Sequence, residues 1–186
     1  MNFFCKMKVN VFIFLVFCVF SFTACAVKTP VKQVSISEVK QNLKYENVVF
    51  RSFKAAPNVT APEGPLLECR RSAIGYLEMK SVFKRVEKDS GENYDGPTMF
   101  VDATLTSLRI VGGAARFFAG AFAGRSNMNM NIKLTDADGL VIAERELIGA
   151  PNALGSAYSF GGTDRSLPQK MGFLLGDFIL SNAAEK

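Results

Sequence analysis

Apolar and polar residues alternate along several stretches of the chain, and the period of each alternation predicts an element. The clearest period of two lies in residues 127–134, where four apolar side chains point one way, namely Met128, Met130, Ile132 and Leu134. Strands are also predicted for residues 47–53, for 82–86 and from Met99 onward. Residues 140–148 return as a partner strand after the turn at Asp136-Ala-Asp-Gly139.

Two longer segments repeat their apolar residues every three or four positions and are predicted to be helices. In residues 66–80 the repeating positions are Leu66, Cys69, Ala73, Tyr76 and Leu77. In residues 167–183 they are Met171, Leu174, Leu175, Phe178 and Ile179, with Ser166 as the expected cap and Pro168 in the first turn. The sequence therefore predicts an α/β (α+β) domain, with a mainly antiparallel sheet of about five strands and two helices.

The N-terminal residues have the order of an export signal. Lys6 and Lys8 precede an unbroken apolar run, Val11 to Phe22, which is twelve residues long. A helix that crosses a bilayer needs about 20 apolar residues, so a permanent membrane span is the weaker interpretation. An uncleaved anchor and an ordinary secretion signal remain as alternatives.

The end of this signal, Phe22-Thr23-Ala24-Cys25, resembles the bacterial lipobox. The resemblance implies cleavage between Ala24 and Cys25, acylation of Cys25 and anchoring in membrane lipid. Ala26 follows the cysteine in place of the aspartate that is linked to inner-membrane retention, so the resemblance favours the outer membrane, with the protein facing the periplasm. The expected organisation is a signal peptide at 1–24, a lipidated N-terminus and tether at 25–43, and a single α/β periplasmic domain at 44–186.

Composition excludes several kinds of site. Histidine is absent, which removes Ser-His-Asp catalysis and histidine metal sites. After cleavage only Cys69 would remain in the domain, at a helical core position, so neither an internal disulfide nor a cysteine zinc site is expected. The mature chain would hold 20 basic and 17 acidic residues, scattered along it, which does not indicate nucleic-acid binding. No cofactor, metal or catalytic residue is predicted.

Residues 112–124 join two predicted strands and are unusually apolar for a loop. They combine small residues with three phenylalanines, and the candidate contact residues are Gly112, Gly113, Arg116, Phe117, Phe118, Gly120, Phe122 and Gly124. The spacing of Gly120 and Gly124 permits close approach of another backbone. One hypothesis is a contact with lipid or with a neighbouring subunit, in which the polar Arg116 limits the depth of insertion. The other is a loop folded back, whose phenylalanines fill the core.

The same region carries a family resemblance. Residues 116–125, followed by the alternating strand, the Asp138-Gly139 turn and the returning strand to Glu144, resemble an uncharacterised family of bacterial lipoproteins known only as a domain of unknown function. The likeness covers roughly Val48 to Ile179, and it departs from the family at the turn, where Thr-Gly is usual. It implies an envelope location and an α/β domain, with no established activity. The arrangement is also distantly similar to the periplasmic domain of curli-export channel lipoproteins.

Together these features predict an outer-membrane-anchored lipoprotein with a non-enzymatic periplasmic domain for interaction or assembly. Its expected partners are membrane lipid, through acylated Cys25, and an envelope protein or further copies of the chain. One alternative is a subunit of an oligomeric envelope export channel. Another is a carboxylate-dependent envelope hydrolase that uses residues such as Asp102 or Asp164.

Overall fold

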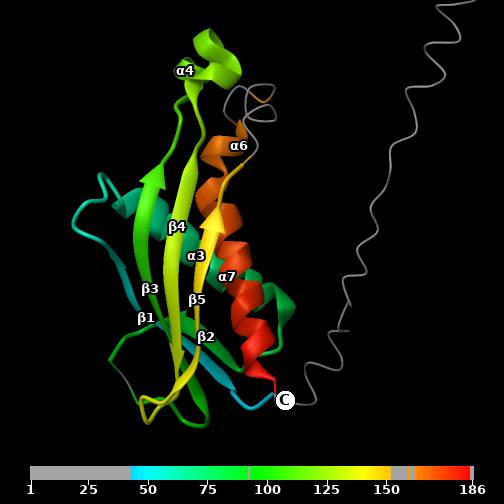
Figure 1. Cartoon of the computed structure of the whole chain (residues 1–186). Helices are drawn as coiled ribbons and strands as arrows, with labels where there is room; N and C mark the ends of the chain where they lie inside the picture. The colour runs from blue at the N-terminus through cyan, green and yellow to red at the C-terminus, as the bar shows by residue number, and fades with distance from the viewer. Residues whose placement is uncertain (1–42, 92, 152–158, 160–161, 185–186) are drawn as a thin grey trace, which may run out of the picture. The chain divides into compact units, whose positions relative to one another are not determined.

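The computed structural model describes residues 43–91, 93–151, 159 and 162–184 (Figure 1). The predicted signal peptide, the lipidation site at Cys25 and nearly all of the predicted tether lie outside these residues. The described residues form a mixed α/β domain with one five-stranded sheet, which confirms the predicted fold class. The strand order is β2-β1-β3-β4-β5.

The strands have the bounds β1 Asn47–Ala55, β2 Arg85–Lys88, β3 Thr98–Arg109, β4 Asn127–Thr135 and β5 Val141–Gly149. Strands β3, β4 and β5 are antiparallel neighbours, whereas β1 pairs in parallel with both β2 and β3. The parallel pairing of β1 with β2 arises because a helix connects them and returns the chain to the same end of the sheet. Strand β2 was expected at 82–86 but begins three residues later, at Arg85. Its pairing with β1 starts there, with Arg85 opposite Asn47.

Two long helices, α3 Glu63–Lys80 and α7 Leu167–Ala183, cover one face of the sheet (Figure 1). Helix α3 begins three residues before the predicted Leu66. Pro65 does not prevent this, since the backbone N–H groups of a first turn have no partner within the helix. Ser81, in the left-handed conformation with φ of 53°, ends α3 and donates its backbone N–H to the carbonyls of Leu77 and Glu78.

The hydrophobic core lies on the helical face of the sheet. The predicted alternation in β4 is confirmed, because Met128, Met130, Ile132 and Leu134 are all buried in the core. Cys69 is also completely buried, as its helical position predicted. On the opposite face, β3 presents Asp102 and Thr104, and the neighbouring strands continue this polar surface. A sheet that is covered on one face alternates in this way.

Helix α7 has the predicted bounds but differs in two details. Ser166 occupies the N-cap position, yet its hydroxyl donates to the carbonyl of Thr163 at 3.1 Å and makes no capping bond. Leu174 was expected on the buried face and is instead 46% exposed. The preceding segment, expected to be a loop, contains the single turn α6 Gly162–Arg165.

Candidate functional site

Residues 112–124, which we call the tip, form the connection from β3 to β4. They fold into helix α4 Gly113–Ala119 and the 3-10 turn η2 Gly120–Ala123, at the end of the domain opposite Ala184 (Figure 1). The prediction of a loop was therefore wrong. Alanine has the highest helix propensity, which favours this short helix, and glycines end both turns in backbone conformations that other residues avoid. Gly120 has φ of 53° and Gly124 has φ of 93°.

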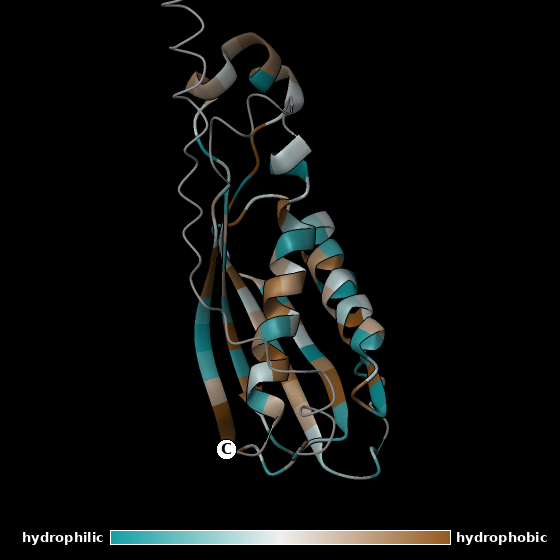
Figure 2. Ribbon diagram, turned by 90° about the vertical axis from the view of Figure 1, so that its right-hand side faces the viewer, coloured by the Kyte–Doolittle hydropathy of each residue, from teal (hydrophilic) through white to brown (hydrophobic). Residues whose placement is uncertain are grey.

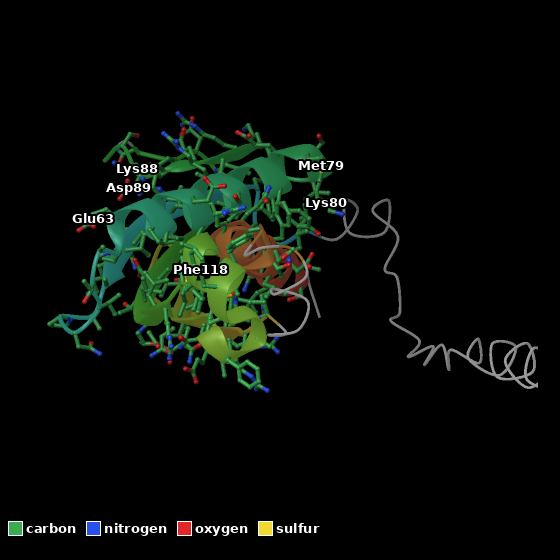
Figure 3. All side chains as sticks on the ribbon, turned by 90° about the horizontal axis from the view of Figure 1, so that it is seen from above. Glu63, Met79, Lys80, Lys88, Asp89 and Phe118 are labelled. Atoms are coloured by element: carbon green, nitrogen blue, oxygen red, sulfur yellow. The ribbon has the colours of Figure 1, made fainter. Side chains whose placement is uncertain are left out.

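The three phenylalanines of the tip do not fill the core. Phe117 is 67% exposed, Phe118 86% and Phe122 97%. Phe117 and Phe118 contact each other edge to face, with ring centroids 5.1 Å apart. Figure 2 shows hydrophobic colours along much of the tip, and Figure 3, which looks down on it, places Phe118 on α4 at the near end of the domain. The hypothesis that these rings pack inward is thus contradicted.

Arg116 is buried, in contrast to the three phenylalanines. It is the charged residue of the tip, and it is 1% exposed. Its guanidinium makes a bidentate ion pair with Asp164, from Nε to Oδ2 at 2.8 Å and from Nη2 to Oδ1 at 3.1 Å. It also donates from Nη1 to the carbonyl of Gly120 at 3.2 Å. The hydrogen-bonded Asp164 carboxylate raises the pKa of Arg116, so this side chain stays charged although it is buried. The expected limit on insertion from Arg116 therefore does not apply, since its charge is not at the surface.

The ion pair joins four segments of the chain. Ser126, directly before β4, donates its hydroxyl to Asp164 Oδ1 at 2.6 Å and accepts the backbone N–H of Val111, which follows β3, at 2.9 Å. The segment after β3, helix α4, the segment before β4 and α6 are thus joined by one chain of hydrogen bonds. Polar groups buried together are stable only when their hydrogen bonds are made, so this network fixes the tip in place.

Cationic side chains lie beside the tip. Arg109, Arg125 and Arg165 are all exposed, and the guanidinium of Arg109 lies so close to Gly124 that a Cβ there would be 2.8 Å from Nη2. No aspartate or glutamate occurs between Asp102 and Asp136 in the sequence. The neighbouring Asp164 does not offset these arginines, because it is already paired with Arg116. The surface around the tip therefore carries a net positive charge.

The two remaining predicted contact residues, Gly112 and Gly113, lie at the start of helix α4. Gly112 is exposed at the N-cap position and Gly113 begins α4. Sequence reasoning missed Ser126 and named Asp164 only as a candidate acid, because nothing in the chain marks two residues 48 positions apart as partners. The three exposed arginines were also missed, although the long interval without acidic residues was a readable signal.

A concave surface lies on the open face of the sheet. Its polar and charged lining comes from four strands, and the residues are Ser52, Lys54, Asp102, Thr104, Asn131, Lys133, Glu144, Arg145 and Glu146. Asp102 is in an ion pair with Arg51, whose pKa it raises through a hydrogen bond from Nε to Oδ1 at 3.1 Å. Both carboxylates named as candidate acids are therefore paired with an arginine, Asp102 with Arg51 and Asp164 with Arg116.

Neither a metal-binding cluster nor a membrane-spanning helix occurs among the described residues. Aspartate, glutamate and cysteine nowhere gather there in a group of three that could hold a metal ion. Within the same ranges, every helix falls short of the length and apolarity that a bilayer crossing requires.

Comparison with known proteins defines the fold. No protein-family model matches the sequence, and curated proteins give no significant match. Among solved structures, the domain resembles the PelC dodecamer from Paraburkholderia phytofirmans, with a TM-score of 0.51, 12% identity, and coverage of 76% of this chain and 91% of that one. A substituted form of that dodecamer, in a second crystal form, gives a TM-score of 0.48 at 14% identity, covering 78% and 92%.

Proposed function

We propose that this chain is an outer-membrane lipoprotein, anchored through acylated Cys25, whose periplasmic domain works by contact and not by catalysis. The anchor rests on the resemblance of residues 22–25 to a lipobox, and the observation that carries the contact role is the tip. Phe117, Phe118 and Phe122 are exposed to water, while Arg116 beneath them is buried in an ion pair that holds them in position. Exposed apolar residues that are fixed in this way are typical of surfaces that meet a partner.

The anchor is tested by the intact mass and membrane fractionation of the wild type beside Cys25→Ser. If the lipobox is processed, the wild type should begin at Cys25, carry acyl chains and fractionate with the outer membrane, whereas Cys25→Ser should show none of these three properties. Equal masses and equal fractionation of the two proteins would refute the anchor and turn attention to residues 11–22 as an uncleaved anchor or a plain secretion signal.

A second candidate is a subunit of a homo-oligomeric envelope assembly, of which an export channel would be one form. The observation that favours it is the fold shared with a protein that is itself a dodecamer. Strands β2 and β5, at the two ends of the sheet order, leave opposite edges for head-to-tail contacts between copies. Native mass spectrometry in detergent should then show a single closed species well above the monomer mass. A strictly monomeric protein would exclude the homo-oligomeric assembly.

The contact role itself is tested by Phe117→Ser/Phe118→Ser/Phe122→Ser. Because the rings are exposed, this variant should fold and be acylated like the wild type, with a change in stability within about 0.5 kcal/mol per site. It should nevertheless lose the crosslinks that the wild type makes in intact cells. The matched control is Leu140→Ser, a similarly exposed apolar residue outside the tip. Identical crosslinks in all three proteins would show that the tip is not the contact surface.

A further inference from the structure

We infer that the tip is a membrane-contact element, in which the phenylalanines enter the interface of a phospholipid bilayer and the surrounding arginines bind lipid phosphates. This inference rests on the proposed function, because it names the occupant of the same contact surface. It differs from anchoring through Cys25, since it concerns a second, non-covalent attachment made by the folded domain.

The first argument is the form of the apolar surface. Phe118 and Phe122 are almost completely exposed, and the alanines at 114, 115 and 119 between and beside the rings are exposed as well. Their backbone is helical, so part of its polar groups is hydrogen-bonded within the tip, including the N–H of Arg116 to the carbonyl of Gly112 and the N–H of Gly120 to the carbonyl of Arg116, which lowers the cost of entering an apolar interface. The tip's own charge, on Arg116, is neutralised by Asp164 below the surface. Nothing charged within α4 or η2 therefore opposes burial in lipid.

The second argument is charge. Arg109, at the end of β3, and Arg125, two residues before β4, flank the tip, and Arg165 lines the same surface hollow as Phe117 and Phe118. Arginine binds phosphate through its planar guanidinium and can keep its charge at the headgroups while its neighbours enter the apolar layer. Phenylalanine together with adjacent basic residues is a combination found where peripheral proteins enter the interface of an anionic membrane.

The same charges disfavour another tip as the occupant. Tips of two copies in contact would bring like charges together on Arg109, Arg125 and Arg165, without an acidic partner among residues 103–135 of either copy. Like charges that face each other across an interface oppose association. A phospholipid surface supplies both an apolar layer and negative charge, so it complements the tip on both counts.

The third argument is reach. The described domain starts at Leu43, which bridges to Ala184 at the end of the domain away from the tip (Figure 1). Residues 26–42 separate it from Cys25, and a chain of that length spans about 60 Å when fully extended. Strand β3, the longest at 12 residues, spans only about 40 Å. The tip can accordingly reach the membrane that holds the lipid anchor.

The experiment uses tryptophan as a local probe, because the chain contains none. The acylated full-length protein with Phe118→Trp is reconstituted in vesicles of phosphatidylethanolamine and phosphatidylglycerol, with and without brominated acyl chains. The inference predicts a blue-shifted emission that the brominated lipid quenches. The matched control, Leu140→Trp, is exposed to the same extent as Phe117 but lies in the β4–β5 turn, and its emission should stay unshifted and unquenched.

A second variant isolates the charges. Arg125→Gln/Arg165→Gln, in the Phe118→Trp background, should reduce the quenching in these vesicles and remove its dependence on salt. Quenching that is unchanged by the double substitution would refute the role of the arginines in binding phosphate.

Two outcomes would overturn the lipid contact. An emission at 118 that stays unshifted and unquenched shows a tip in water. A blue shift without quenching by brominated lipid shows contact with another copy of the chain, the only protein in the vesicles, which leaves the proposed contact role intact and refutes only the inference. The intact mass of the same sample tests the anchor separately. If acyl chains are absent, the proposed lipid anchoring is refuted, independently of the emission at position 118.

Discussion

At the scale of single residues, the position of the tip depends on Arg116 and Asp164. Arg116→Leu would leave the Asp164 carboxylate buried without a counter-charge, which strongly destabilises a folded structure. We expect faster amide hydrogen exchange across residues 111–126 and a lower melting temperature. Arg125→Leu makes the same chemical change at an exposed site and should alter neither.

A further variant separates charge from packing. Arg116→Leu/Asp164→Leu leaves no uncompensated charge, so it should recover part of the stability that Arg116→Leu loses. If the double variant is no more stable than Arg116→Leu, or if Arg116→Leu leaves hydrogen exchange in the tip unchanged, the ion pair does not hold the tip.

Cys69 gives a prediction on pH. Burial raises the pKa of this thiol from its usual value of about 9 to about 12. The unfolded chain therefore loses the thiol proton first as pH rises, so this contribution to stability is complete below about pH 9 and declines above it. At about pH 10 the loss amounts to about 1.4 kcal/mol.

Denaturant unfolding of the wild type and Cys69→Ala at about pH 8 and about pH 10 measures this contribution. The alanine variant lacks the titrating group, so its free energy of unfolding should fall less between the two pH values. Tyr76, whose pKa is also raised to about 12 by burial and by its hydrogen bond to Asp177, is present in both proteins and cancels in the comparison. An equal fall in both proteins would contradict the assignment to Cys69.

At the scale of elements, α3 and α7 depend on glycine for their close packing. A Cβ at Gly172 would lie 2.4 Å from the backbone oxygen of Cys69 and 2.6 Å from Cβ of Ser72. Because backbone cannot give way, Gly172→Ala should push the helices apart and cost about 1–3 kcal/mol. Gly75→Ala, in α3 with open space around it, should instead stabilise by about 0.5–1 kcal/mol. Thermal unfolding of the two variants tests this, and shifts of the same sign would contradict it.

Elements with strong periodicity were predictable from the sequence. In β4 the alternation of Met128, Met130 and Ile132 with asparagine has a single interpretation, and α7 was predicted at its observed bounds. The tip was not predictable as a helix, because its apolar side chains face water and so lack the period that burial produces. Its ion pair was equally hidden, since the fold alone brings Arg116 to Asp164.

At the scale of the whole molecule, the affinity of the tip for a membrane would rise if copies of the chain assemble. Closed cyclic symmetry places the same surface of each copy on the same rim, so several tips would meet one membrane together. Linked weak contacts bind far more tightly than separate ones, so a small set of phenylalanines could then hold the domain at the lipid surface. An anchor at Cys25 and tips at the other end of the domain would together fix its orientation.

The central claim is that the domain works by contact through the tip, and site-specific photocrosslinking in intact cells tests it most directly. A photoreactive amino acid replaces Phe118 in the full-length protein, and Leu140 in a control of comparable exposure. We predict products with phospholipid, or with a protein, at position 118 and none at position 140. The account is contradicted if position 118 gives no more product than position 140, since the tip would then face water in the cell.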